Sequence, residues 1–159
     1  MKTWQIVTLI CALVGGFTMN QGMAGEGQKI VRAGERASYK GPPELFTGSV
    51  RVDPVFSATD GIPAIGGTVT FEPGARSNWH FHPTGQHIIV ISGVGRTGTR
   101  DGKVEEFRAG DVVTCPPGVH HWHGASPTVG MTHLTITGEV HGKNTEWLEP
   151  VTDEQYHPR

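Results

Sequence analysis

Between Lys40 and Val140 the chain consists of short segments in which apolar and polar residues alternate. In TGSVRVD, Val50 and Val52 fall on one face of an extended strand, and GGTVTFEPG alternates small, β-branched and aromatic residues. HIIVISG is instead a nearly continuous β-branched run, which is typical of a strand covered on both faces. The pattern therefore predicts strands along most of the chain.

Glycine and proline mark the turns between these segments. RTGTRDGKVEEF carries Asp101-Gly102 at its centre, which is a strong signal for a tight hairpin. AGDVVTCPPG begins and ends with turn residues, and GMTHLTITGEV is a further strand candidate. No helical period is convincing in this part of the chain. Roughly seven or more short strands joined by such turns predict an all-β sandwich or small barrel in one domain.

The last segment, NTEWLEPVTDEQYHPR, leaves two alternatives open. It holds a short helical turn, or it runs as an arm across a neighbouring subunit. Trp147 and Leu148 need an apolar surface to pack against in either case, because large apolar side chains gain free energy on leaving water. A dimer partner is one such surface.

Residues 1–24 carry a different pattern. Lys2 precedes the apolar run WQIVTLICALVGGF, and Gly22 and Ala24 occupy the −3 and −1 positions of a cut after Ala24. These parts predict a secretory signal peptide. The apolar run is shorter than the roughly 20 residues that a membrane-spanning helix needs. Cleavage near Ala24 predicts a periplasmic or secreted protein with no membrane segment.

Composition adds limits rather than a function. The hydrophobic share of 36%, the charged share of 18% and a formal net charge of −2 suit a globular domain and give no reason to expect nucleic acid. Cleavage also removes Cys11, so that Cys115 has no internal disulfide partner; it is interpreted as a small buried strand residue rather than a nucleophile. The predicted parts are a signal peptide at 1–24, an N-terminal arm at 25–45, a barrel at 46–141 and a C-terminal arm at 142–159.

Histidines are concentrated in one part of the chain, because seven of the nine lie between His80 and His133. His80 and His82 stand two residues apart, so on a strand they project to the same side, about 7 Å apart along it. His121 and His123 repeat the spacing. Two such pairs beside strands favour a metal site over surface histidines. A zinc finger is excluded because one cysteine cannot supply the usual thiolate ligands.

The first histidine pair lies within a longer motif. Gly74, five residues, His80, one residue, His82, three residues, Gln86, six residues and Gly93 resemble the first motif of the cupin superfamily. One position departs from that motif, since Gln86 stands where cupins usually have glutamate.

The second histidine pair lies within a second motif. Gly110, five residues, Pro116, Pro117, Gly118, two residues and His121 resemble the second cupin motif, although Ala125 stands where it usually ends in asparagine. This resemblance implies a cupin jelly-roll barrel, the double-stranded β-helix.

A narrower resemblance rests on Gln86 together with FEPGAR, HWHGA, MTHL and VTDEQY. From about Phe46 to Tyr156 the chain is similar to small bacterial manganese cupins with (R)-hydroxynitrile (mandelonitrile) lyase activity. The resemblance implies four metal ligands, namely His80, His82, Gln86 and His121. It also implies that His133 is the proton-transfer base and that His123 is a second pocket histidine.

His87 is the competing fourth ligand, because the motif tolerates one more residue. Gln86 is favoured, since Gly93 follows it at the required six residues and His87 points to the opposite face of the strand.

Three neutral imidazoles and a neutral amide leave the charge of a divalent ion uncompensated, which makes the site more electrophilic than one with glutamate. Nitrogen and oxygen donors admit several ions. Following the resemblance, manganese is expected first, with iron, nickel, cobalt and zinc as alternatives. Histidine ligands also predict that acid strips the metal.

His133 shares a strand face with Thr135 and Thr137, which suits a wet barrel interior, and a histidine with a pKa near neutrality can exchange a proton at working pH. Phe71, Trp79 and Trp122 either line a pocket for an aryl group or belong to the core.

The function predicted first is a metal-dependent lyase that cleaves or forms 2-hydroxynitriles, with a small molecule as substrate. The alternatives are a metal-dependent cupin dioxygenase, because a redox metal can activate oxygen, and a non-catalytic cupin that binds a small molecule. A homodimer or homotetramer is expected, since sheets of this kind often pair through edges or faces.

Overall fold

Strands make up almost all of the regular structure in the computed structural model, which describes residues 27–157. The predicted signal peptide at 1–24 lies outside these residues. Within these described residues, all strands and the one short helix fall in a compact unit, Arg32–Arg159, and the sequence-based prediction of an all-β domain is confirmed. No helix within the described part of the chain is long and apolar enough to cross a membrane.

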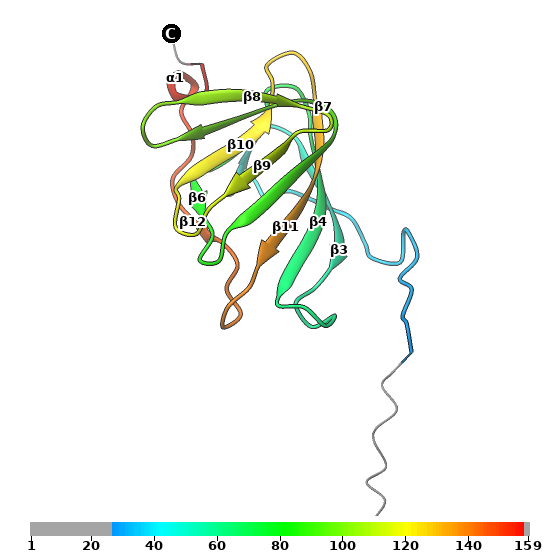
Figure 1. Ribbon diagram of the computed structural model, residues 1–159. Coiled ribbons are helices and arrows are strands. Elements are labelled where there is room, and N and C mark those ends of the chain that lie inside the picture. Colours follow the sequence, from blue (N-terminus) through cyan, green and yellow to red (C-terminus); the bar gives the residue numbers. More distant parts are fainter. Residues whose placement is uncertain (1–26, 158–159) are drawn as a thin grey trace, which may run out of the picture. The chain divides into compact units, whose positions relative to one another are not determined.

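The elements follow one another along the chain with short connections (Figure 1). They are β1 (Tyr39–Lys40), β2 (Phe46–Thr47), β3 (Val50–Phe56), β4 (Ala64–Phe71), β5 (Arg76–Ser77), β6 (His80–Phe81), β7 (Gln86–Thr99), β8 (Val104–Arg108), β9 (Val112–Cys115), β10 (His121–Ala125), β11 (Met131–Gly138), β12 (Glu146–Trp147) and α1 (Asp153–Tyr156).

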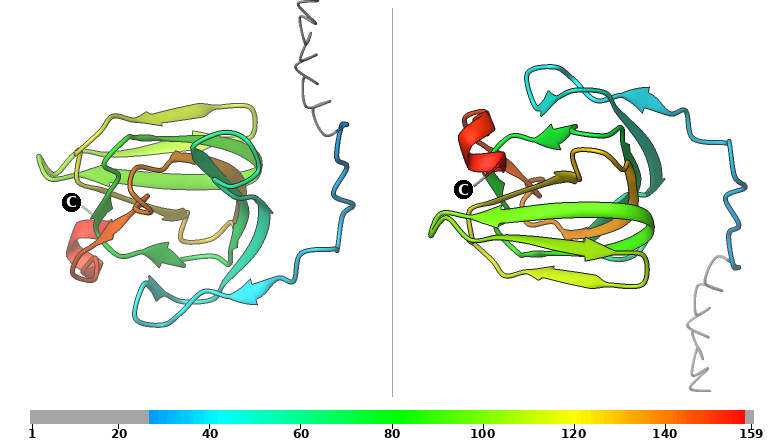
Figure 2. Two further views of the ribbon diagram at one scale, coloured as in Figure 1. Left: turned by 90° about the horizontal axis from the view of Figure 1, so that it is seen from below. Right: turned by 90° about the horizontal axis from the view of Figure 1, so that it is seen from above.

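The strands form one curled antiparallel sheet with the order β1-β3-β4-β11-β7-β10-β5-β2. Figure 2 shows its strands bent around a common interior, as in a small barrel. β7 joins the two halves of the sheet. Its residues 86–93 pair with β11, and β9 pairs with part of the same stretch, whereas its residues 94–99 pair with β8 and β10. This long strand therefore belongs to both halves of the sheet and connects them.

The predicted hairpin lies between β7 and β8, where Gly102 has a φ of 84°, a value that favours glycine. Gly93, the last glycine of the first motif, has a φ of 81°, and a Cβ added there would lie 1.9 Å from the Gly130 carbonyl oxygen. Only glycine fits this close approach, which gives the motif position a physical reason.

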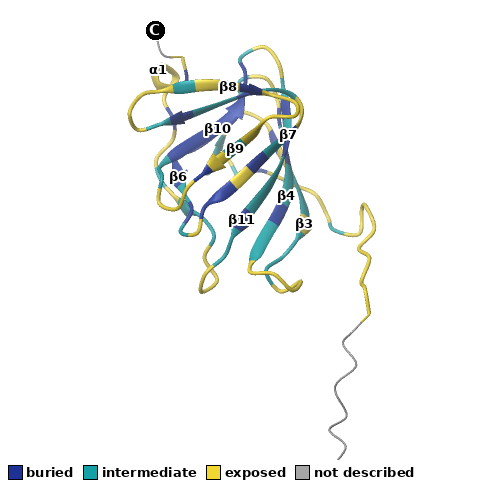
Figure 3. Ribbon diagram, in the orientation of Figure 1, coloured by how far each residue is buried: buried dark blue, intermediate teal, exposed yellow. Residues whose placement is uncertain are grey.

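Buried and more exposed residues alternate along the first part of β7 (Figure 3), and the buried apolar residues that the structure describes form two cores. The first core lies in the barrel interior and consists of Val50, Val69, Phe71, Ala75, Val90, Phe107, Ala125 and Met131. The other lies under the C-terminal segment and contains Trp79, Trp122, Val151 and Tyr156. Trp79 and Trp122 therefore belong to the core and also line a separate cavity of about 370 Å³, which contains no histidine of the described chain, whereas Phe71 lines the cavity described below.

The C-terminal segment packs on its own barrel. β12 pairs with β6, so that Trp147 lies opposite His80. The predicted helical turn is α1, which Thr152 begins with a capping box, and the ring of Tyr156 packs on Trp122. The same chain thus supplies a surface that Trp147 contacts, with Phe46 and His80 against its ring.

Candidate metal centre and cavity

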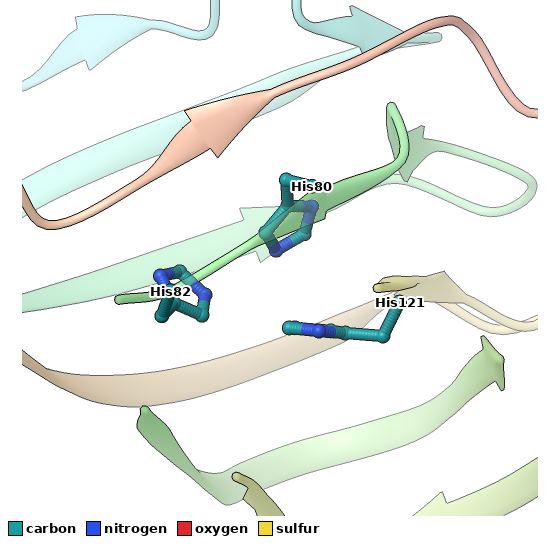
Figure 4. Close-up of side chains that lie close together, drawn as sticks. All are labelled: His80, His82 and His121. Carbon is teal, nitrogen blue, oxygen red and sulfur yellow. The ribbon is translucent and has the colours of Figure 1, made fainter. Parts of the chain in front are cut away.

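Three histidines from two separate segments meet inside the barrel. His80 lies on β6 and His82 directly after it, while His121 begins β10 and pairs with His80 across the sheet. One ring nitrogen from each lies within 4.8 Å of those of the others. Figure 4 shows the three rings turned toward a common space. We call these residues the ligand trio. The convergence of His80 and His82 is the one that their spacing in the sequence predicts.

Each ring of the ligand trio is held by a backbone carbonyl. Nδ1 of His80 donates a hydrogen bond to Asn78 O (2.9 Å). Nδ1 of His82 donates to Asn144 O (2.7 Å), and Nδ1 of His121 donates to Val119 O (2.9 Å). Because a carbonyl oxygen only accepts, Nδ1 carries the hydrogen and Nε2 keeps its lone pair. This arrangement orients an imidazole for metal binding.

The side-chain atoms that lack a hydrogen-bond partner agree with a metal-binding role. Nε2 of His82, Nε2 of His121 and Oε1 of Gln86 are buried and have no hydrogen-bond partner among residues 27–157. Buried polar atoms without a partner are costly, and an ion is one way to satisfy them. Burial lowers the pKa of His121 to about 4 and the pKa of His80 well below its usual value, so the rings are neutral, as a metal ligand must be.

Gln86, at the start of β7, is buried and faces the ligand trio. Its Nε2 donates a hydrogen bond to Thr137 Oγ1 (3.0 Å), which leaves the lone pairs of Oε1 free to coordinate a metal ion. Burial lowers the pKa of His82, and contacts with the Asn144 carbonyl and with the Gln86 side chain oppose that shift. His87 is exposed and lies beside Thr114 on the outside of the sheet. Of the two candidates for fourth ligand, the structure brings only Gln86 to the trio.

Two further histidines, His123 on β10 and His133 on β11, form a second group that we call the inner pair. Their ring centroids are 5.0 Å apart, and both rings pack against Phe71, at 5.6 Å from His133 and 5.8 Å from His123. Nδ1 of His123 and both ring nitrogens of His133 have no hydrogen-bond partner within the described chain. No carbonyl in that part of the chain holds these nitrogens as it does in the ligand trio.

The ring of His133 is fully buried, and this burial lowers its pKa to about 3. The pKa of His123 also falls well below its usual value, first through burial and then through the neighbouring charge of His133. The pKa near neutrality expected for His133 from the sequence is therefore wrong. A strand pattern reports which side a residue faces, whereas the pKa depends on how completely water is excluded there.

A cavity of about 280 Å³ lies next to these groups. His80, His82, Gln86 and His123 supply polar groups to its wall, and so do Thr135 and Thr137, as the strand pattern of β11 predicts. The remaining wall is mainly apolar and includes Pro42, Leu45, Phe46, Val52, Ile65, Val69, Phe71 and Trp147. His133 does not line the cavity, but it contacts His123 and Phe71, which do.

Sequence reasoning missed the contribution of the C-terminal segment. Asn144, Thr145 and Trp147 line the cavity, and the Trp147 ring lies 4.9 Å from that of His80. The sequence indicated that Trp147 needs an apolar contact, but it did not indicate where that contact lies. Cys115 is buried, and burial raises its pKa to about 11, so the thiol is an inert core group rather than a nucleophile.

Comparison with known proteins agrees with this geometry. The family model described as "Cupin domain" matches residues 67–136. The chain is 54% identical, over 80% of its own length and 98% of the relative, to a protein named (R)-mandelonitrile lyase from Granulicella tundricola.

Solved structures agree as well. A cupin-like protein from Thermotoga maritima shares 41% identity over 80% of this chain and 96% of its own, with a TM-score of 0.72. An oxalate decarboxylase from Bacillus subtilis, described as having Mn(II) centres, shares 27% identity over 64% of this chain and 28% of its own, with a TM-score of 0.51. These matches confirm the predicted fold, and the chain belongs to the cupin family.

Proposed function

We propose that this protein is a metal-dependent lyase that cleaves 2-hydroxynitriles to an aldehyde and hydrogen cyanide and catalyses the reverse addition. The observation that carries the proposal is the 54% identity to a protein named (R)-mandelonitrile lyase over 98% of that relative. The buried histidines and the cavity beside them give this chain groups suited to that reaction.

His80, His82, His121 and Gln86 would hold a divalent ion, and we propose manganese first. The Mn(II) centres named for the Bacillus subtilis oxalate decarboxylase support this choice. When bound, such an ion supplies Lewis acidity toward negative charge that develops in the cavity. All four ligands are uncharged, so they would leave the positive charge of the ion uncompensated.

The cavity walls would bind and orient the substrate. A volume of about 280 Å³ is at the small end of the range for ligand sites and suits a compound with a single aryl ring. Phe46, Phe71 and Trp147 offer an apolar surface for that ring, and His80, His82, Gln86 and His123 offer polar groups beside it. A hydroxyl and nitrile group would therefore point toward these polar groups.

We assign proton transfer to the inner pair. In cleavage, the hydroxyl proton passes to a histidine, the bond between carbon and cyanide breaks with its electrons on cyanide, and the aldehyde carbonyl forms. The proton then passes to cyanide, giving hydrogen cyanide. His123 lines the cavity and His133 contacts His123, and both rings are neutral at working pH because burial lowers each pKa. Cyanide left in the cavity favours the protonated ring, which helps a weak base to act.

The test follows benzaldehyde release from mandelonitrile with manganese-loaded protein, in air and under nitrogen, and uses metal-free protein as the matched control. The proposal expects the same turnover in both atmospheres and a large loss without metal. Oxygen uptake with a catechol or flavonol, without nitrile cleavage, would identify a dioxygenase instead. Tight binding of the nitrile without turnover would identify a binding protein.

A further inference from the structure

The cavity of about 280 Å³ opens to solvent beside two segments of the chain. Among its lining residues, Tyr39 is 52% exposed and Trp147 is 37% exposed, whereas Phe71 and His80 are at most 1% exposed. Tyr39 belongs to residues 39–46, which also contribute Phe46 to the wall, and Trp147 belongs to residues 144–147. These two segments therefore border the entrance of the cavity.

Aromatic rings form a connected row from this entrance to the inner pair. The rings of Trp147 and Phe46 meet edge to face with centroids 5.6 Å apart, and those of Phe46 and Phe71 do so at 6.0 Å. Phe71 is fully buried and contacts both His123 and His133. We call Trp147, Phe46 and Phe71 the aromatic row. It leads from the exposed part of the wall to the histidines assigned to proton transfer.

Trp147 lies at the outer end of the aromatic row and also beside the ligand trio. Its ring centroid is 4.9 Å from that of His80, because β12 pairs with β6 and places the two residues opposite each other. Trp147 also has the largest side chain on the cavity wall. The indole therefore takes up space between solvent and a proposed metal ligand.

Hydrogen bonds on both sides of Trp147 hold its segment against the barrel. Leu148 N donates to Trp79 O (2.8 Å), and Trp79 N donates to Glu149 O (3.0 Å). On the other side, Asn144 O accepts a hydrogen bond from His82 Nδ1 (2.7 Å). A wall fixed in this way yields little to a larger ligand, because overpacking forces side chains and backbone out of their preferred positions.

We infer that Trp147 is a specificity-determining residue that limits the substrates of this site to 2-hydroxynitriles with a single aryl ring, an inference that rests on the proposed function. When the hydroxyl and nitrile groups lie beside His80 and His123, the aryl ring lies along Phe46 and Phe71 and ends at the indole. Edge-to-face contacts between rings favour an aryl group there. A second fused ring would overlap the indole, which excludes larger aryl groups.

The test compares two substrates on each protein, mandelonitrile and the matching 2-naphthyl hydroxynitrile, and measures the ratio of their kcat/KM values. Because both substrates are measured on one preparation, the ratio does not depend on metal loading, which a change at Trp147 could alter through its contact with His80. We expect the wild type to favour mandelonitrile. Trp147→Ala should shift the ratio toward the naphthyl compound by about tenfold or more, the scale on which pockets discriminate small changes in substrate size.

Leu148→Ala is the matched control. Leu148 is the next residue of the same segment, but its side chain packs against the second core and lies outside the cavity wall. This variant should keep the wild-type ratio. An unchanged ratio in Trp147→Ala would overturn the inference, as would an equal shift in Leu148→Ala, which would mean that loosening of the segment is the cause. A wild type that cleaves both substrates equally well would also overturn it.

A binding measurement separates this inference from the proposed function. If metal-loaded wild type cleaves neither nitrile, the proposed function fails, and the dissociation constants of benzaldehyde and 2-naphthaldehyde, measured by calorimetry, replace the kinetic ratio. A shift of about tenfold toward the larger aldehyde in Trp147→Ala, absent from Leu148→Ala, would support Trp147 as the size limit of the cavity. Absence of that shift, or binding of neither aldehyde to the wild type, would overturn it.

Discussion

The barrel holds two groups of buried histidines that differ in how their nitrogens are satisfied. In the ligand trio, a backbone carbonyl holds every Nδ1 atom, and the remaining nitrogens converge. In the inner pair, no carbonyl within residues 27–157 holds Nδ1 of His123 or either nitrogen of His133. Both groups are equally buried, so burial alone does not separate them.

The difference indicates two different functional roles for the histidines. A ring with one nitrogen fixed by a carbonyl has a set tautomer and orientation, which suits a permanent ligand. A ring with free nitrogens can take up and release a proton without breaking a hydrogen bond, which suits proton transfer. The predictions below test this division, beginning with the largest expected effect.

His121→Ala compared with His123→Ala tests the division most directly, because both residues face the interior from β10, two positions apart. We expect His121→Ala to retain less than about one tenth of the wild-type metal after dialysis, since a direct ligand is lost and even indirect partners are worth 10- to 100-fold in affinity. His123→Ala should retain its metal. Elemental analysis measures both, and equal metal content in the two variants would contradict the division.

His133→Phe tests proton transfer while keeping a ring against Phe71. We expect turnover of mandelonitrile to fall by about 10²- to 10⁴-fold, the range for loss of a general acid–base group. Metal content should not change, because His133 does not belong to the ligand trio. Retention of more than about a third of wild-type turnover would exclude His133 from this role.

Thr137→Val tests how Gln86, the proposed fourth ligand, is held. The hydroxyl of Thr137 accepts from the amide nitrogen of Gln86, and this contact decides which end of the amide faces the trio. Valine keeps the shape and removes the hydroxyl, so we expect metal affinity to fall by about 10- to 100-fold. Titration against a competing chelator gives the value. Thr137→Ser should restore most of the affinity, and an unchanged affinity in the valine variant would argue against this contact.

Acid should destabilise the metal-free protein. The pKa of His121 is about 4 and that of His133 about 3 in the folded chain, against about 6.5 when unfolded. The unfolded chain therefore binds more protons, and the free energy of unfolding is highest above pH 6.5 and falls as the pH drops toward 4. Each such ring contributes at most about 1.4 kcal/mol per pH unit.

Urea titrations of the metal-free protein at several pH values measure this slope. His133→Phe should show a shallower slope than the wild type, because one titrating ring has been removed. A free energy of unfolding that stays constant from pH 7 to pH 5 would show that these rings gain protons equally well in the folded chain.

Local patterns were sufficient to predict much of the fold and part of the site. Alternation along β11 put His133, Thr135 and Thr137 on one side, and the same rule put Gln86 inside and His87 outside. Glycines at turns marked the strand ends. These features depend on neighbours in the chain, which is why a sequence reveals them.

Long-range packing could not be predicted in the same way. The pairing of β12 with β6 joins residues that are far apart in the chain, and it brings Trp147 to His80 and the Asn144 carbonyl to His82. Nothing in the alternation of NTEWLEP indicates that pairing. The low pKa of His133 likewise depends on Phe71 and His123, which come from other strands.

The carbonyls that hold the ligand trio belong to the main chain, at Asn78, Val119 and Asn144. Every amino acid supplies such an oxygen, so no substitution at these three places removes it directly. Substitutions of the side chains at these positions should therefore leave the orientation of the imidazoles unchanged, so long as the loops keep their path. Redesign of this centre would accordingly succeed or fail through loop geometry more than through the choice of supporting side chains.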